Sequence, residues 1–276
     1  MMRHMRSSRP FSFSRRCALV LTTAVLAGCA GLSGAPTARP LALLPTDAIL
    51  LGEQHDAPEH QKVHAQVVEI LSRRANLTAL TLEMVEQGHN TVGMSSRSDA
   101  TAVRRALRWN DAAWPWKLYG PVVMAAVVDD IPVFGANLPR SEMQAAMQDS
   151  SLDTRLTPQA LQAQHSAIRA GHCGLLPEAQ IVPMARVQIA RDRAMAQAVL
   201  DNARPGGVVL LLAGSGHVDR QVGVPLHFPP GFRAQAVRLL AGGNAASPPP
   251  PGFDVVWPTP AVPAKDHCAE LRRKLP

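Results

Sequence analysis

The segment VVLLLAGSGHV, residues 208–218, is an unbroken apolar run that ends in a glycine turn and a histidine. A strand without alternating polar residues is buried on both faces, as the inner strands of a helix-covered parallel sheet are. A second segment, ILLGEQH at 49–55, has the same order of apolar run, glycine and histidine. We therefore predict two strands of one parallel sheet, with His55 and His217 just beyond their carboxyl ends.

Strand and helix patterns alternate along the rest of the chain. The expected strands are 47–53, 77–85, 131–139, 208–218, 232–240 and 253–258. The expected helices are 57–74, 99–130 with a break at Trp114–Pro115, 141–149, 157–170 and 183–203. This alternation predicts an α/β fold with a mostly parallel central sheet flanked by helices. The irregular stretches 86–130 and 157–182 are expected to form a helical cap layer over it.

The N-terminus has the features of a bacterial export signal. Residues 1–16 carry five arginines and no acid, and the apolar run 17–28 is shorter than the roughly 20 residues that span a bilayer. The end of this run, 26–29, is similar to a lipobox, which implies a signal peptide over 1–28 and a lipid such as palmitate on Cys29. The alternative is an ordinary cleaved signal with a chance cysteine. Residues 29–44 then form a flexible tether, and 45–276 a single domain.

Removal of the signal peptide changes the charge of the protein. The formal charge falls from +7 to +2, because all five arginines of residues 1–28 are lost. The high isoelectric point is therefore no sign of nucleic-acid binding, and we expect no nucleic-acid partner. We expect the membrane as a partner through the lipid anchor, with the protein in the bacterial cell envelope at the outer membrane.

The cysteines that remain in the exported chain predict a disulfide. Cys17 leaves with the signal and Cys29 carries the lipid, which leaves Cys173 and Cys268. Two remaining cysteines in an oxidising compartment indicate a Cys173–Cys268 bond, with two unpaired thiols as the alternative. The chain has no Cys-x-x-Cys spacing that would indicate a zinc site.

Titratable residues follow three of the expected strands. Glu53 and His55 follow the first, Glu83 ends LTLEMV (80–85), and His217 follows LLLAGSG. The carboxyl ends of parallel strands share one edge of the sheet, so these side chains are expected in one pocket, with glycines allowing the sharp turns. Two carboxylates and two imidazoles suit a divalent metal or acid–base chemistry. The alternative for each histidine alone is a hydrogen bond to a helix cap.

Two further polar groups lie on expected helices. Arg191 and Asp192 could point into the crevice and orient an anion, or form a charge pair at the surface. His60 and His64 are four residues apart and share a helix face, which we interpret as polar, with a metal or haem edge as the alternative.

The segment WPWKLYGPVVMAA (114–126) is the most aromatic part of a chain with 4% aromatic residues. It contains Tyr119, the only tyrosine, together with Trp116. A flat apolar ligand would bind such a surface, and a tyrosine phenolate can ligate haem iron. A helix packed on the sheet through its aromatic side chains is the alternative.

Taken together, these motifs resemble those of the ChaN-like haem-binding lipoproteins over about residues 45–230. The segments that carry the resemblance are LLGEQHDAPEHQKVHAQ (50–66), LEM (82–84), WPWKLYGPVV (114–123), VFGANLPR (133–140), ARVQIARDRAMA (185–196) and LLAGSGHVDRQVGVP (211–225). The resemblance implies haem as the cofactor and a role in haem and iron uptake. It also implies membership of a wider α/β group with the erythromycin esterases and Tiki metalloproteases, in which strand-end histidine motifs line a catalytic cleft.

Residue by residue, the resemblance places Glu53, His55, Glu83 and His217 in the pocket motifs. It nominates Tyr119 as the haem ligand, with Trp116 beside the porphyrin. His165, His172 in AGHCG (170–174) and His55 are the alternative iron ligands. The chain departs from the expected pattern at Gln61, where a second histidine of a pair is expected.

Three hypotheses follow. The first is a lipid-anchored haem-binding protein for haem and iron uptake, with haem held at a homodimer interface. The second is a metal-dependent hydrolase that uses the Glu53, His55, Glu83 and His217 pocket with a divalent metal. The third is a structural envelope lipoprotein with a vestigial pocket.

Overall fold

The computed structural model describes residues 46–74, 76–244 and 248–274. These residues lie within one compact unit that spans Pro36–Pro276. The predicted signal peptide, the predicted lipidation of Cys29 and the predicted tether lie outside the described residues. Among the helices in the described ranges, none is both long and apolar enough to cross a membrane.

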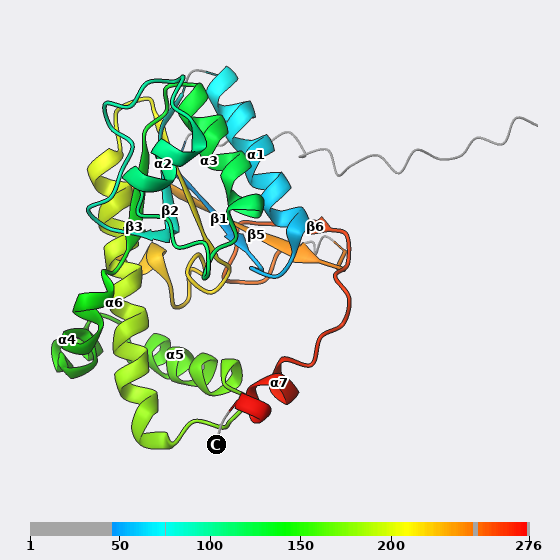
Figure 1. The fold of residues 1–276 in the computed structure, drawn as a ribbon. Helices are drawn as coiled ribbons and strands as arrows, with labels where there is room; N and C mark the ends of the chain where they lie inside the picture. The colour runs from blue at the N-terminus through cyan, green and yellow to red at the C-terminus, as the bar shows by residue number, and fades with distance from the viewer. Residues whose placement is uncertain (1–45, 75, 245–247, 275–276) are drawn as a thin grey trace, which may run out of the picture. The chain divides into compact units, whose positions relative to one another are not determined.

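The core is a six-stranded sheet whose strands all pair in parallel (Figure 1). The strand order is β3-β2-β4-β1-β5-β6. The strands are β1 (Ala48–Glu53), β2 (Leu77–Glu86), β3 (Val133–Asn137), β4 (Val208–Gly214), β5 (Ala234–Ala241) and β6 (Val255–Thr259). Every residue of β1 and β4 is buried, and the two strands are neighbours with Glu53 opposite Gly214. The predicted inner strands and parallel sheet are confirmed.

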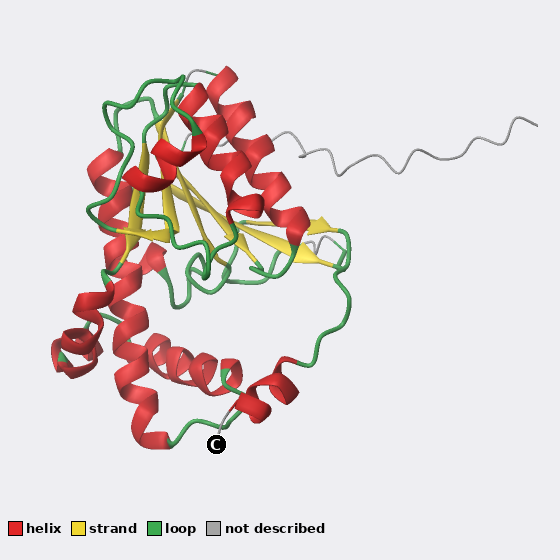
Figure 2. Ribbon diagram, in the orientation of Figure 1, coloured by secondary structure: helices red, strands yellow, loops and turns green. Residues whose placement is uncertain are grey.

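Helices cover both faces of this sheet (Figure 2). The helices are α1 (Pro58–Arg73), α2 (Ala100–Ala106), α3 (Trp116–Val128), α4 (Met143–Gln148), α5 (Pro158–Gly171), α6 (Glu178–Asn202) and α7 (His267–Lys274). Apolar residues of α1 and α3 pack on one face, and residues 195–199 of α6 pack on the other. The first half of α6 extends past the sheet and packs against α4 and α5, which form the helical layer there (Figure 1).

The longest helix begins earlier than the sequence predicts. The prediction placed its start at Pro183, but α6 starts at Glu178 and continues through that proline. A proline removes one hydrogen bond, here to the carbonyl of Ala179. Ala179 is exposed in the first turn, so water can hydrogen-bond to its carbonyl in place of the lost N–H. The predicted break at Trp114–Pro115 is confirmed, since α3 starts directly after Pro115.

Candidate active-site cluster and haem ligands

Four side chains predicted to meet at the sheet edge do so. Glu53 is the last residue of β1 and Glu83 lies near the end of β2, while His55 and His217 lie in the turns after β1 and β4. Glu83 is at the centre: its Oε2 lies 3.9 Å from His55 Nε2 and its Oε1 lies 3.5 Å from His217 Nε2. The backbone N–H of Gly214 also donates to Glu83 Oε2 at 2.6 Å. Two imidazole rings therefore face one buried carboxylate.

Each histidine has a second carboxylate behind it. His55 Nδ1 donates to Glu53 Oε1 at 2.6 Å, and His217 Nδ1 donates to Asp192 Oδ1 at 2.6 Å. A carboxylate partner on Nδ1 fixes the ring orientation and leaves Nε2 directed at Glu83. The cluster can therefore hold a proton on either histidine and exchange it with Glu83.

Glu53 is held as a carboxylate by three donors. Besides His55, the Tyr119 hydroxyl donates to its Oε1 at 2.5 Å and the Gln61 amide donates to its Oε2 at 2.7 Å. Burial by itself would raise the pKa of Glu53, but the hydrogen bond from His55 and the charges of His64 and His55 outweigh it and lower the pKa. Burial likewise opposes protonation of His55, but the Glu53 hydrogen bond and the Glu83 charge raise its pKa.

Asp192 and His217 form a buried ion pair. Burial raises the pKa of Asp192 to about 6, against the lowering effect of His217. Burial would lower the pKa of His217, but the Glu83 and Asp192 charges raise it to about 9. Asp192 is therefore ionised and His217 protonated between these values. The sequence did not decide whether Asp192 points into the crevice or pairs with Arg191 at the surface. The structure places its side chain in the crevice.

The two glycines of the strand-end motifs are required for space and not for a turn. Neither Gly52 nor Gly214 has a positive φ, which differs from the expected sharp turn. A Cβ on Gly52 would lie 2.3 Å from Val218 Cγ2, and one on Gly214 would lie 2.9 Å from His55 Nε2. The glycines therefore allow the loop after β4 to approach β1, and His55 to lie over the end of β4.

The interpretation of the first helix as polar at His60 and His64 is wrong. Both side chains are fully buried. His60 accepts from the Gln54 N–H at 2.9 Å and donates to Thr259 Oγ1 at 2.9 Å, and burial lowers its pKa to about 4. His64 Nδ1 lies 3.5 Å from Glu53 Oε2, and burial lowers its pKa. Gln61, which stands where a histidine was expected, is a donor to Glu53.

The burial of Tyr119 argues against its predicted role as iron ligand, which stays a prediction. Its side chain is 1% exposed, and an iron could reach the hydroxyl only if the Glu53 contact broke. Burial and the Glu53 charge also raise the pKa of Tyr119, so the phenolate form that binds iron is disfavoured. Trp116 packs edge-on against Trp109 at 5.0 Å on the same helical layer. The aromatic segment thus matches the alternative of a helix packed on the sheet.

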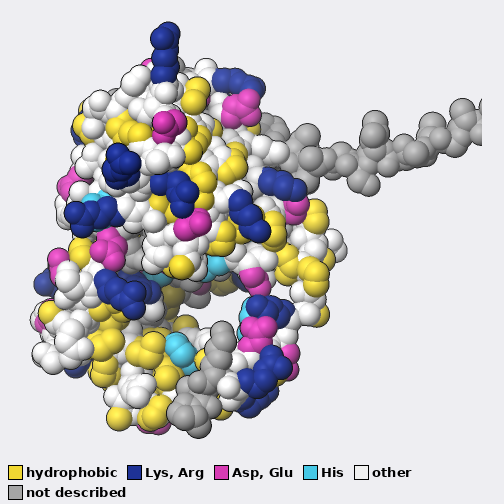
Figure 3. All heavy atoms as spheres, viewed as in Figure 1, with side chains coloured by type: hydrophobic (Ala, Val, Ile, Leu, Met, Phe, Trp, Pro, Cys, Tyr) yellow, Lys and Arg dark blue, Asp and Glu magenta, His cyan; other side chains and the backbone are white. Residues whose placement is uncertain are grey.

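A cavity of about 390 Å³ lies in front of the histidines. His55, His217 and Asp192 line it together with Gln164 of α5 and Gln188 of α6. Figure 3 shows the surface hollowed between the sheet edge and the helices below it, with histidine side chains at its margin. Arg191 does not line this cavity. It lines a second cavity of about 610 Å³ at the ends of β2 and β3.

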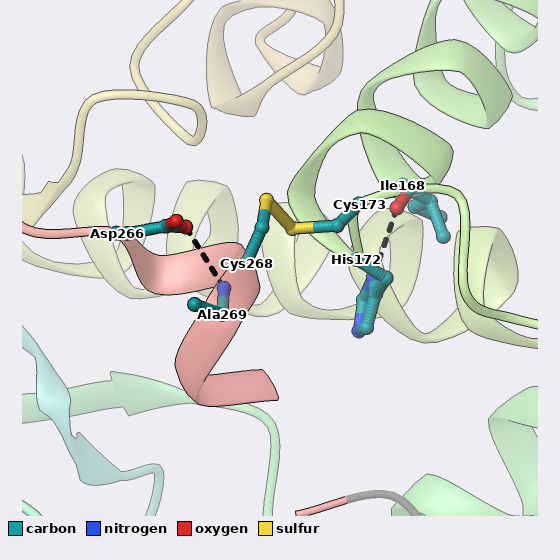
Figure 4. Close-up of a disulfide and its surroundings, with 6 residues drawn as sticks. All are labelled: Ile168, His172, Cys173, Asp266, Cys268 and Ala269. Carbon is teal, nitrogen blue, oxygen red and sulfur yellow. Dashed lines mark hydrogen bonds between the residues drawn. A yellow bond between two sulfur atoms is a disulfide. The ribbon is translucent and has the colours of Figure 1, made fainter. Parts of the chain in front are cut away.

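His165 and His172 lie on α5 and at its C-terminal end, away from Tyr119. His165 Nε2 is buried and has no hydrogen-bond partner within the described ranges. His172 is half-buried, and its Nδ1 donates to the Ile168 carbonyl at 2.8 Å, which leaves Nε2 as the acceptor nitrogen. The Cys173–Cys268 disulfide joins this end of α5 to α7, as predicted. Figure 4 shows the His172 ring beside it, pointing away from the two sulfur atoms.

The metal alternative has no support in the described part of the chain. No group of three or more His, Cys, Asp or Glu side chains there has an arrangement that could hold a metal ion. The nearest approach is the Glu53, His55, Glu83 and His217 cluster, in which carboxylates pair with imidazoles instead of converging with them on one point.

Comparisons with known proteins agree with this fold. A family model described as haem-binding uptake, Tiki superfamily, ChaN matches residues 41–228. A solved structure described as "Cofacial heme binding to ChaN of Campylobacter jejuni" is 26% identical, with a TM-score of 0.61, over 76% of this chain and 86% of that chain. No curated protein matches.

Two further solved structures are more distant. The type III effector HopBA1 is 14% identical with a TM-score of 0.36, over 78% of this chain and 88% of that one. A protein from Bacillus cereus is 13% identical with a TM-score of 0.34, over 70% and 65%. At these TM-scores neither informs the function of this chain. The family match covers more than half of the sequence, and the chain therefore belongs to the ChaN haem-binding uptake family of the Tiki superfamily.

Proposed function

We propose that this protein binds haem for haem or iron uptake, as a lipoprotein anchored through Cys29 in the cell envelope at the outer membrane. The observation that carries the proposal is the family match over residues 41–228, together with the likeness to ChaN of Campylobacter jejuni. That relative is described as binding haem cofacially. The membrane anchor rests on the lipobox-like sequence alone.

The iron ligand that best fits this chain is His172. A histidine that binds a metal through one nitrogen commonly donates its other N–H to a backbone carbonyl, which fixes the tautomer and orients the ring. His172 already has this arrangement, because its Nδ1 donates to the Ile168 carbonyl. Haem bound here would supply an iron that an imidazole nitrogen can ligate.

The other three predicted haem residues fit less well. Tyr119 and Trp116 are occupied in the packing of α3, and Tyr119 is hydrogen-bonded to Glu53. His165 has a free Nε2 within the described ranges, but this atom is buried, so a ligand would have to open the helix packing around it. His172 needs no such change.

The disulfide supports the proposed ligand. Cys173 adjoins His172, and its bond to Cys268 holds the last turn of α5 against α7 (Figure 4). The ring is thereby fixed at an end of the helix that would otherwise fray. Exported haem-binding proteins work in an oxidising compartment where such a bond persists.

We extend the proposal to a homodimer with haem between the two copies. A two-fold interface presents the same surface from both subunits. One His172 from each copy would therefore face the bound haem. Sedimentation of the chain with and without haemin tests this part, and a mass that stays monomeric with haem bound would contradict it.

Haemin titration tests the proposed function. We expect a Soret band distinct from that of free haemin, and His172→Ala should weaken binding by about tenfold or more. His165→Ala is the matched control from the same helix. Binding that is equally strong in His172→Ala would reject the ligand, and a spectrum that stays that of free haemin would reject haem binding itself.

A further inference from the structure

The cavity of about 610 Å³ at the ends of β2 and β3 is lined by residues that suit a ligand. Its volume lies within the ~300–1,000 Å³ of small-molecule sites. None of its lining residues lines the cavity in front of His55 and His217. Glu83 is one of its lining residues, and the Glu83 carboxylate also lies near the two histidines of the other cavity.

Three arginines from separate parts of the chain line this cavity. They are Arg108 after α2, Arg140 after β3 and Arg191 on α6. None of the three makes an ion pair with any described residue within 4.0 Å. The acids on the same wall are Glu83, which is engaged by Gly214 and the histidines, and the exposed Glu86. The cavity therefore has more positive than negative charge.

The Arg191 guanidinium is partly buried without adequate partners. Its Nε is buried and makes no hydrogen bond to the described chain, where its only polar contact is from Nη2 to the Met143 sulfur at 4.0 Å. A buried charge without a partner is costly, and a guanidinium pairs best with a planar carboxylate through two parallel hydrogen bonds. The Oδ1 of Asn137 in the same cavity is also buried without a donor from the described residues.

Most of the remaining lining is apolar and partly aromatic, with Met84, Val85, Ala113, Trp114, Leu138 and Met143. His89 and Asn110 are its other polar residues. Trp114 contacts the His55 ring edge-on at 4.9 Å, so the indole is held in place at this wall. A fixed aromatic side chain favours a flat hydrophobic partner.

We propose that this cavity binds an organic carboxylate with a flat apolar body, whose carboxylate is held by Arg191 and whose body lies against Trp114. Arg108 and Arg140 add positive charge at the rim and attract the anion. His172, the proposed haem ligand, does not line this cavity.

Fluorescence titration of the haem-free full-length chain with 1-pyrenebutyrate tests the proposal. The neutral analogue 1-pyrenebutanol has the same aromatic body without the carboxylate. We expect saturable binding of the carboxylate, weaker binding of the alcohol, and a loss of about tenfold in carboxylate affinity in Arg191→Gln, as for a charge-assisted hydrogen bond.

Arg193→Gln is the matched control. It makes the same charge change two residues along α6, on an exposed side chain that lines a different cavity. The affinity of this variant for 1-pyrenebutyrate should stay within about twofold of that of the unmodified chain, because an exposed charge contributes little to binding. Arg140→Gln, at an exposed position, is a second test that does not depend on the folding of Arg191→Gln. It should also weaken binding of the carboxylate.

Three results would overturn the proposal. The first is the absence of saturable binding. The second is equal affinity for the carboxylate and the alcohol. The third is an equal loss of affinity in Arg191→Gln and Arg193→Gln, which would indicate a general effect of charge.

Discussion

His217 Nδ1 lies 2.6 Å from Asp192 Oδ1, and this contact joins the loop after β4 to the middle of α6. Both side chains are largely buried, so the pair fixes the rotation of α6 relative to the sheet edge. His217 Nε2 is thereby directed to Glu83 at 3.5 Å. The placement of His217 in the cluster depends on this ion pair.

The pair predicts a loss of stability at alkaline pH. The pKa of His217 is about 9 in the folded chain, above the ordinary value of 6.5. The folded state therefore binds the proton more tightly, and this stabilisation is complete below about pH 6.5 and lost as pH rises toward 9. Urea denaturation across this range should show the free energy of unfolding falling. Asp192→Asn should reduce the slope, while the larger effect of the Glu83 charge keeps part of it. An equally steep fall in that variant would contradict the assignment.

Tyr119→Phe should affect stability but not haem binding. The hydroxyl donates to the buried Glu53 carboxylate, and a hydrogen bond to a charged group is worth about 1.5–3 kcal/mol. We expect the free energy of unfolding to fall by this amount, measured by urea denaturation. The Soret band of the haem complex should keep its position and intensity. A shifted or missing band would restore Tyr119 as the iron ligand.

Gly52→Ala should destabilise the fold through crowding. The added Cβ would lie 2.3 Å from Val218 Cγ2 and 2.9 Å from Ser215 Cα, which is backbone and cannot turn away. Overpacking of this kind costs about 1–3 kcal/mol. Gly216→Ala, in the loop after β4 that Gly52 contacts, is the control, because nothing lies within 4 Å of its Cβ position. If the two variants unfold at the same urea concentration, the close-approach explanation fails.

Reduction of the Cys173–Cys268 bond should release the C-terminal segment. The bond joins residues 95 apart and holds α7 against the end of α5. Disulfides that close long loops contribute about 2–4 kcal/mol. Limited proteolysis with mass spectrometry should show faster cleavage in residues 260–266 after reduction. The haem affinity should fall as well, because Cys173 adjoins His172. Unchanged cleavage and affinity would show that α7 stays docked without the bond.

The strands and their shared edge were predictable because the signal is local. The apolar runs before Gly52 and Gly214 mark buried strands, and parallel pairing places their ends together whatever the rest of the chain does. The glycines were predicted for the wrong reason, since their need for space depends on Val218 and His55, which approach only in the folded chain.

The residues that were misjudged depend on helix rotation. His60 and His64 read as polar on α1, but both face the core because Thr259 and Glu53 lie opposite them. Asp192 and Arg191 are adjacent in sequence, yet they line different cavities on the two sides of α6. A single sequence gives the spacing of such residues but not the angle at which the helix packs on the sheet.

The most direct test of haem binding is an equilibrium haemin titration of the purified full-length chain, followed by difference spectroscopy in the Soret region. We expect a saturable Soret band that differs from that of free haemin and weakens in His172→Ala but not in His165→Ala. A spectrum that remains that of free haemin at every ratio of haemin to protein would contradict haem binding.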